Sequence, residues 1–130
     1  MPRVTGIARF FLVTDVAGAV EYYRDKLGFT IRGYFFEEPP VFAMVGRDDQ
    51  IVMLSLMTAG RGGSNRDHKD DALDAYIWVD DVDTLYAEFQ RSGADLVGPP
   101  QLRIYGMKEL EVRDLDGYVL CFGEEIKESG

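Results

Sequence analysis

Histidine and cysteine, two residue types that are common in catalysis, each occur once in this chain, and the candidate residues match none of the common reaction motifs in their spacing. His68 is the only histidine, so a serine such as Ser55 or Ser64 has no adjacent general base in a nucleophile motif. The stretch GRGGSN, residues 60–65, lacks the lysine and the following helix of a phosphate-binding loop. We interpret it as a flexible linker, and neither nucleophilic nor phosphoryl-transfer chemistry is indicated.

The overall composition narrows the classes of partner. The net charge is −9, from 23 acidic and 14 basic residues, which argues against binding to nucleic acid or to an anionic membrane surface. No apolar run approaches the roughly 20 residues that cross a bilayer, and MPRVTGIARF has no signal-peptide pattern. Cys121 is the only cysteine, which excludes an internal disulfide and makes the reducing cytoplasm the expected compartment. The acidity either keeps the protein in solution or attracts a cationic ligand to a negative cleft.

The elements that must position any functional residues follow from periodicity. In the first half, β-branched and aromatic patterns predict strands over residues 6–14, 29–37, 41–45 and 51–57. Asp15 is a suitable helix N-cap, and Gly28 is a suitable terminator. Between them apolar residues recur at helical spacing, namely Val16, Ala19, Val20, Tyr23 and Leu27.

The second half follows the same order. Strands are predicted over residues 74–80, 94–98, 107–114 and 118–124, with a loop over 99–106. Asp81 and Gly93 bound a helix whose apolar face carries Val82, Leu85, Tyr86 and Phe89. Gly117 lies in a tight turn between the last two strands, where it can take a positive φ.

Each half therefore has the order strand, helix, strand, strand, strand, and the two halves also share residues at one fixed offset. Val13, Asp15 and Val16 correspond to Val79, Asp81 and Val82. Internal duplication explains this correspondence. One such unit exposes an apolar sheet face, which a second unit or a partner chain must cover.

We therefore expect an α+β fold in which two βαβββ repeats form a curved mixed sheet. The modules are expected at residues 5–58 and 72–126, joined by a linker over 59–71, within a single domain that spans 1–130.

Two motifs resemble a known family. VTDVAGAVEYYRDKLGF, residues 13–29, and VRDLDGYVLCFGE, residues 112–124, are similar to segments of the vicinal oxygen chelate superfamily. That superfamily includes glyoxalase I, extradiol dioxygenases, fosfomycin-resistance enzymes and bleomycin-resistance proteins. The resemblance covers nearly the whole chain and implies the glyoxalase/bleomycin-resistance/dioxygenase fold.

The resemblance also indicates where a metal would bind in enzymes of this superfamily, which use His, Glu or Gln on strands that face a cleft. The corresponding positions here are Ala8, Met53 or Ser55, Asp74 and Cys121. Alanine cannot bind a metal, and serine and methionine are poor ligands for a hard cation. A site formed by His68, Asp74 and Cys121 is conceivable, but the usual donor set is lost. We therefore expect no metal, no cofactor and no catalytic residue.

Within the superfamily three stretches most resemble bleomycin-resistance proteins, namely DVAGAVEYYRDKLGF, AYIWV with the following LYAEF, and FAMVGRDD with the strand after it. Those proteins sequester a cationic drug in a cleft between two subunits, where aromatic rings hold its planar part and acids receive its cationic tail. Tyr105 stands where the family carries a tryptophan. The resemblance implies ligand-binding positions at Phe42, Ser55, Asp74, Tyr76, Tyr105 and Cys121.

Further acids and one further ring belong to this interpretation. The acidic residues near the cleft mouth either add negative charge or are simply solvated, and they are Glu37, Glu38, Asp48 and Asp49. We expect Tyr76 to line the cleft on the same sheet face as Asp74. We expect Trp78 to point to the opposite face and to pack beneath the helices.

The sequence thus predicts a metal-free homodimer that binds a flat, cationic small molecule, for resistance, sequestration or transport. Pairing with a second chain would also protect exposed strand edges. The N-terminal strand is a candidate for packing on, or exchanging with, that chain. Two alternatives remain. One is a metal-dependent lyase, isomerase or dioxygenase of the same superfamily, and the other is a regulatory module that binds a protein partner.

Overall fold

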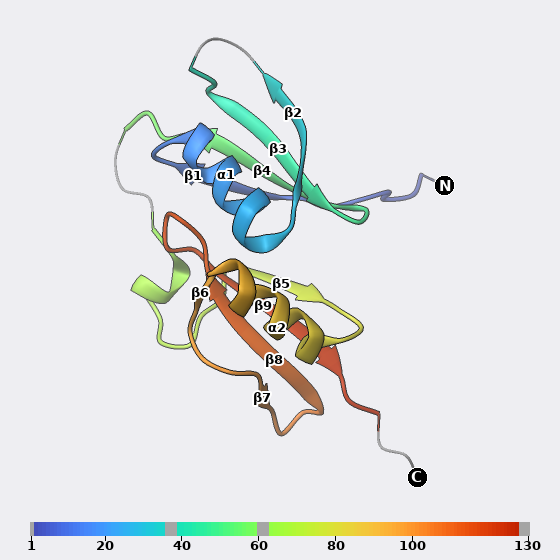
Figure 1. Cartoon of the computed structure of the whole chain (residues 1–130). Helices are drawn as coiled ribbons and strands as arrows, with labels where there is room; N and C mark the ends of the chain where they lie inside the picture. The colour runs from blue at the N-terminus through green and yellow to red at the C-terminus, as the bar shows by residue number, and fades with distance from the viewer. Residues whose placement is uncertain (1, 36–38, 60–62, 128–130) are drawn as a thin grey trace. The chain divides into compact units, whose positions relative to one another are not determined.

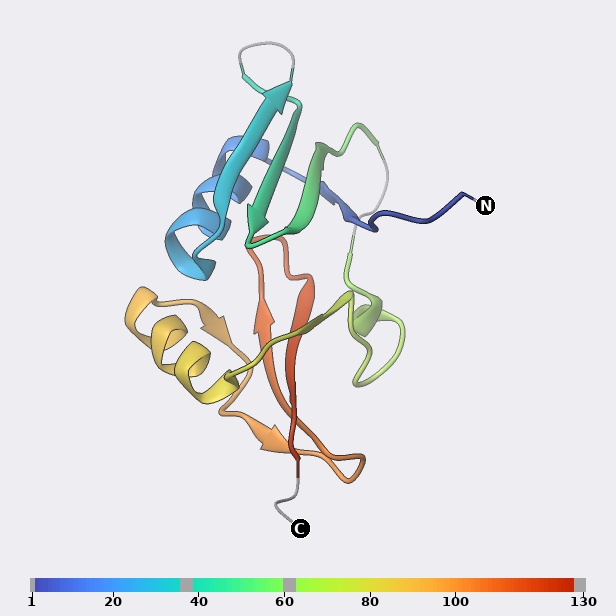
Figure 2. The same cartoon turned by 90° about the vertical axis from the view of Figure 1, so that its right-hand side faces the viewer.

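The computed structural model describes residues 2–35, 39–59 and 63–127 (Figures 1 and 2). The chain divides into two units, Met1–Gly62 and Gly63–Gly130, and each is described by itself. In the described ranges neither α-helix has the length and apolar character needed to cross a membrane.

The first unit places one helix on one face of a mixed sheet. It contains β1 (Arg9–Val13), α1 (Val16–Leu27), β2 (Thr30–Phe35), β3 (Phe42–Arg47) and β4 (Gln50–Leu56). The strand order is β1-β4-β3-β2, with β1 parallel to β4 and the other neighbours antiparallel.

Helix α1 follows its apolar spacing closely. The five residues predicted for its inner face are all buried. Gly28 ends the helix with φ of 75°, a left-handed conformation that glycine adopts without a Cβ clash. Asp15 occupies the N-cap position, but its side chain makes no capping hydrogen bond.

The second unit repeats this arrangement. It contains β5 (Ala75–Trp78), α2 (Val82–Ser92), β6 (Asp95–Leu96), β7 (Gln101–Leu102), β8 (Met107–Arg113) and β9 (Val119–Glu125). The order β5-β9-β8-β6 matches β1-β4-β3-β2, and β5 is again parallel to β9. The prediction of two βαβββ repeats in an α+β fold is confirmed.

Two short elements were not predicted from the sequence. Residues 99–106 were expected to be a loop, but β7 pairs with β8 there, at Gln101 with Glu109 and Leu102 with Lys108. A 3-10 helix, η1 (Asn65–Asp67), lies in the segment expected to be an unstructured linker, and residues 60–62 of that segment lie outside the described residues. Both elements are too short to produce a periodic pattern.

Helix α2 covers one face of the second sheet, as Figures 1 and 2 show, and leaves the other face open. The rings of Phe89 on α2 and Phe122 on β9 lie 5.3 Å apart in an edge-to-face contact. Phe122 is opposite Ile77 on β5 and Leu110 on β8, so these residues mark the helix-covered face. Alternation along the strands then places Tyr76, Trp78, Met107, Glu109, Glu111 and Cys121 on the open face.

Asp74 fastens the η1 segment to this sheet. Its side chain is buried and accepts hydrogen bonds from the Ser64 hydroxyl at 2.6 Å, the Asn65 amide at 2.7 Å and the Val119 amide at 2.8 Å. Ser64 in turn caps η1. Each carboxylate oxygen of Asp74 therefore receives at least one backbone N–H group, which only an acceptor can satisfy.

We predict that Asp74→Asn lowers the free energy of unfolding by about 3 kcal/mol, because either orientation of the amide turns an NH₂ group against a backbone N–H and leaves it unsatisfied. Chemical denaturation measures the effect. Asp95→Asn is the control, since Asp95 belongs to an exposed ion pair with Arg113, and it should change stability little. Equal stabilities for the two variants would contradict the anchoring role.

Candidate functional site

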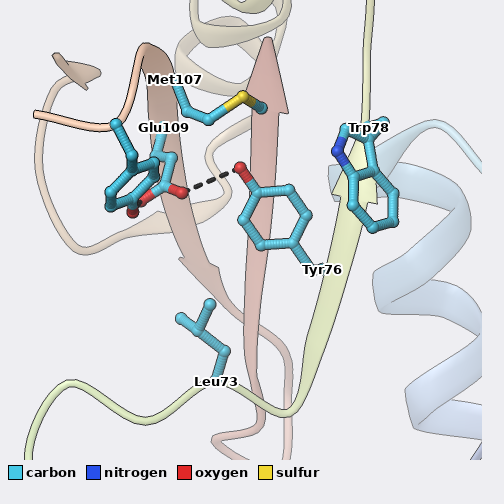
Figure 3. A pocket seen from close by; sticks show the side chains of 6 residues that line it. Leu73, Tyr76, Trp78, Met107 and Glu109 are labelled. Atoms are coloured by element: carbon cyan, nitrogen blue, oxygen red, sulfur yellow. Dashed lines mark hydrogen bonds between the residues drawn. The ribbon is translucent and has the colours of Figure 1, made fainter. Parts of the chain in front are cut away.

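The open face of the second sheet holds a pocket of 340 Å³. This volume lies within the range of about 300–1,000 Å³ that is common for small-molecule sites. Its lining residues are Leu73, Tyr76, Trp78, Tyr105, Met107 and Glu109 (Figure 3). The pocket is open to solvent on its aromatic side, because Trp78 is 74% exposed and Tyr105 is 63% exposed.

Tyr76 and Trp78 form an aromatic wall together. Their rings lie 4.9 Å apart with an interplanar angle of 55°. The expectation that Trp78 packs beneath the helices is wrong, because residues two positions apart on a strand share a face. The same alternation that places Tyr76 in the pocket therefore places Trp78 there as well.

Gly123 allows the Tyr76 side chain to cross the sheet. On β9 this glycine is opposite Trp78 on one side and Glu109 on the other. A Cβ atom added at Gly123 would overlap the Tyr76 hydroxyl group. Because glycine leaves that space open, the Tyr76 ring lies over β9, and Figure 3 shows its hydroxyl pointing toward Glu109.

Glu109 is the polar centre of the pocket. Its carboxylate is only 5% exposed and accepts hydrogen bonds at both oxygens. Tyr76 Oη donates to Oε2 at 2.8 Å, while Tyr105 Oη at 2.7 Å and Arg103 Nε at 3.1 Å donate to Oε1. These donors supply the pairing that a buried carboxylate requires.

A second carboxylate continues the network along the same face. Glu111 Oε1 accepts from Arg66 Nη1 at 2.9 Å, and Glu111 Oε2 lies 3.8 Å from Arg103 Nη2. Arg103 thus lies between Glu109 and Glu111. The two carboxylates are matched by two guanidinium groups, so this cluster has no net charge.

The two tyrosine hydroxyls of the pocket are held protonated. Burial raises the pKa of Tyr76, and the hydrogen bond to Glu109 and its charge raise it further. The hydrogen bond to Glu109 is also the largest cause of the raised pKa of Tyr105. Both hydroxyls therefore act as hydrogen-bond donors near neutral pH, and neither is available as a phenolate base.

Comparison with known proteins identifies the family of this chain. The model of the glyoxalase/bleomycin resistance protein/dioxygenase superfamily matches residues 6–122. The chain belongs to this superfamily. The resemblance found in the sequence is thereby confirmed. A separate sequence comparison with curated proteins found no match.

Solved structures share the superfamily fold. A bleomycin-binding protein from bleomycin-producing Streptomyces verticillus, complexed with copper(II)-bleomycin, is 25% identical with a TM-score of 0.69, covering 98% of this chain and 100% of its own. TioX from Micromonospora sp. ML1 is 23% identical with a TM-score of 0.72, covering 95% and 100%. A glyoxalase-related enzyme from Clostridium phytofermentans is 14% identical with a TM-score of 0.76, covering 96% and 98%. The last two likenesses concern the fold alone.

The positions that correspond to metal ligands in superfamily enzymes do not fit a divalent cation here. Both oxygens of Asp74 face N–H and O–H donors, and His68 is exposed at the end of η1. Within residues 2–35, 39–59 and 63–127, no three His, Cys, Asp or Glu side chains converge as a metal site. Ala8, Met53 and Ser55 contribute no strong donor.

Cys121 is adjacent to the pocket network without lining the pocket. It is opposite Tyr76 on β5 and Glu111 on β8, and its side chain is fully buried. Burial is the largest cause of a thiol pKa raised to about 12, and the charges of Glu109 and Glu111 act in the same direction. The thiol is therefore protonated at neutral pH, whereas nucleophilic attack and metal ligation require the thiolate.

The remaining predicted positions lie in the first unit. Phe42 on β3 is opposite Ser55 on β4, and its ring centroid lies 6.0 Å from that of Phe10. Asp48 and Asp49 are exposed in the turn between these strands, whereas Glu37 and Glu38 lie outside the described residues. A ligand-binding role for Phe42 and Ser55 stays a prediction.

The structure adds pocket residues that the sequence analysis did not name, namely Leu73, Met107 and Glu109, and it places Arg103 beside the pocket as a partner of Glu109. A usable signal was present for Met107 and Glu109. In MKELEVR, Leu110 and Val112 are apolar and alternate with Met107, Glu109, Glu111 and Arg113. If the apolar positions face the helix, the intervening acids must face the open side.

We predict that Gly123→Ala displaces the Tyr76 ring and costs about 1–3 kcal/mol of stability, the usual range for overpacking. Because Trp78 is the only tryptophan and lies beside Tyr76, its emission spectrum should change as well. Gly98→Ala is the matched control, since a Cβ there would meet no atom within 4 Å. A Gly123→Ala protein with the melting temperature and emission of the wild type would contradict the close approach.

We also predict that Cys121 does not react with a disulfide reagent at neutral pH in the folded protein, and that it reacts fully in denaturant. The folded thiol pKa of about 12 exceeds the unfolded value, so the stability contributed by this group is complete at neutral pH. That contribution is lost as the pH rises above about 8.5, where the unfolded thiol ionises. Spectroscopic thiol counting checks the first outcome, and rapid labelling of the folded protein would refute it.

Proposed function

We propose that this protein is a metal-free binding protein that sequesters a flat, cationic small molecule in the pocket of its second unit. The observation that carries the proposal is a buried carboxylate, Glu109, directly beside three aromatic rings. Tyr76, Trp78 and Tyr105 provide flat surfaces, and Glu109 provides an acceptor at the base.

The aromatic side chains favour a planar ligand. Offset or edge-to-face contacts between rings contribute about 0.5–1.5 kcal/mol each beyond the burial of area. Trp78 gives the strongest ring for contact with a cation, because indole binds cations more strongly than phenol does. Its high exposure means that a ligand could stack on it without displacing any side chain of the core.

Sequestration is favoured over catalysis by the state of the polar groups. The tyrosine hydroxyls and the thiol are protonated near neutral pH, so none of them is poised as a base or nucleophile. The donor positions of the metal-dependent enzymes are not suited to a cation. A structural relative is described as a bleomycin-binding protein complexed with copper(II)-bleomycin, which supports ligand binding within this fold.

We further propose that the functional form is a homodimer. The open face of the first sheet presents Phe10, which is 51% exposed, and Leu12, which is 43% exposed. Apolar residues grouped on an uncovered sheet face are typical of association surfaces. A second copy of the chain would remove them from water.

The proposal is tested with two planar probes of nearly equal shape, 9-aminoacridine, which is cationic, and acridine, which is neutral at mildly alkaline pH. We expect 9-aminoacridine to quench Trp78 fluorescence and to raise the melting temperature, with acridine weaker. Tyr105→Ala and Glu109→Gln should each weaken binding of the cation about 5–10-fold, from lost ring contact and lost charge respectively.

Asp83→Asn is the control for charge, because Asp83 pairs with Lys108 on the helix-covered side, and it should bind the cation like the wild type. A chelator should leave the melting temperature unchanged, and light scattering on the same samples should give a dimer. A chelator-induced fall in melting temperature would instead favour the metal-dependent enzyme. Absence of binding by both probes would overturn the proposal.

A further inference from the structure

We infer that Arg103 is an internal competitor for the carboxylate that the ligand uses. In the unliganded protein its guanidinium group occupies Glu109, and a cationic group that enters the pocket replaces it there. Arg103 then shifts toward Glu111. This inference rests on the proposed function and identifies the residue that limits its affinity for a cation.

In the pair of Arg103 and Glu109, the acceptor Glu109 is buried and the donor Arg103 is more accessible to solvent. Glu109 is 5% exposed and is also held at Oε2 by the Tyr76 hydroxyl. The Arg103 side chain is 36% exposed, and it reaches Glu109 only through Nε, at 3.1 Å from Oε1. If the two groups separate, the arginine can therefore move into solvent, while the carboxylate stays in place.

Arg103 also has a second partner within reach. Its Nη2 atom lies 3.8 Å from Glu111 Oε2, which is beyond a good hydrogen bond but close enough for a small rotation to shorten. Arg66 uses the other oxygen of Glu111, Oε1, and leaves this position open to Arg103. Exchange at Glu109 thus leaves the displaced guanidinium beside a carboxylate.

The local chain geometry links this exchange to the aromatic wall. Arg103 and Tyr105 share one tight turn, closed by the Arg103 amide to the Met107 carbonyl at 2.7 Å and the Gly106 amide to the Arg103 carbonyl at 3.1 Å. Both side chains donate to the same oxygen, Glu109 Oε1, whereas Tyr76 donates to Oε2. A ligand cation at Oε1 therefore replaces Arg103 beside the Tyr105 ring and leaves the Tyr76 contact at Oε2 intact.

This arrangement discriminates by charge. A neutral ring has no charge to pair with Glu109, so it stacks on the wall and leaves the ion pair of Arg103 and Glu109 intact. A cation gains the carboxylate but must first displace the guanidinium, which weakens its net binding. Removal of Arg103 should therefore strengthen binding of a cation, although the substitution deletes a residue beside the pocket.

The experiment compares Arg103→Gln and Arg103→Met with the wild type, using 9-aminoacridine and acridine and following Trp78 fluorescence. We expect both variants to bind 9-aminoacridine about 5–10-fold more tightly and acridine with unchanged affinity. Arg103→Lys, which keeps the charge, should gain less affinity for 9-aminoacridine than either neutral variant. Lys108→Gln also removes one positive charge, but from the side that faces Asp83 on α2, and it should leave both affinities unchanged.

The outcomes separate this inference from the proposed function. If the wild type binds 9-aminoacridine and both Arg103 variants bind it equally or more weakly, Arg103 is not a competitor and the binding function stands. If the gain persists when Glu109→Gln is added to Arg103→Gln, the gain does not come from Glu109 and the inference fails. If no protein binds either probe, both fail. Melting curves on each variant, with two neutral replacements of Arg103, show that a loss of binding is not a loss of folding.

Discussion

The pocket depends on the pairing of one buried carboxylate. An ionised group with as little exposure as Glu109 is unfavourable unless donors surround it. The donors that meet this requirement are Tyr76 from β5 and Tyr105 and Arg103 from the turn before β8. Because two of the three are tyrosines, the interactions that stabilise the charge also place the aromatic walls. The same residues therefore pair the charge of Glu109 and determine the shape of the pocket.

The duplicated scaffold has two open faces of different chemistry. The strand registers make β1, β3 and β4 equivalent to β5, β8 and β9. On the second sheet the open face carries Tyr76, Trp78, Glu109, Glu111, Cys121 and Gly123, and the equivalents on the first sheet are Phe10, Leu12, Phe42, Met44, Met53 and Ser55. The first face is thus almost wholly apolar, while the second holds a paired charge network. One fold has placed an apolar face and a polar pocket at equivalent positions.

Sequence patterns predict the features that periodicity and helix capping determine. They do not predict features that depend on contacts between segments distant in sequence. The buried face of α1, the positive φ of Gly117 and the duplicated topology all follow from local patterns. The hydrogen bonds of Asp74 that hold the η1 segment could not be predicted, because its partners include Val119, which is distant in sequence. Arg103 lies in a segment without periodicity, and Glu109 becomes a pocket residue only when β8 pairs with β9 opposite Gly123. The error at Trp78 differs in kind, since strand alternation alone would have placed it correctly.

For the cation binding that we propose, the net charge of the chain and the charge of the pocket would act at different stages. The chain carries −9, yet at the pocket Glu109 and Glu111 are matched by Arg103 and Arg66, so the excess negative charge lies elsewhere on the protein. Exposed acids attract a cation over about 8–10 Å at cellular ionic strength, which raises the rate of encounter with any cation. They cannot distinguish one cation from another at the carboxylate. Under the proposed function, that choice depends on which cation can take the place of a guanidinium group while its ring lies against Trp78, and selectivity would come from exchange within a locally neutral cluster.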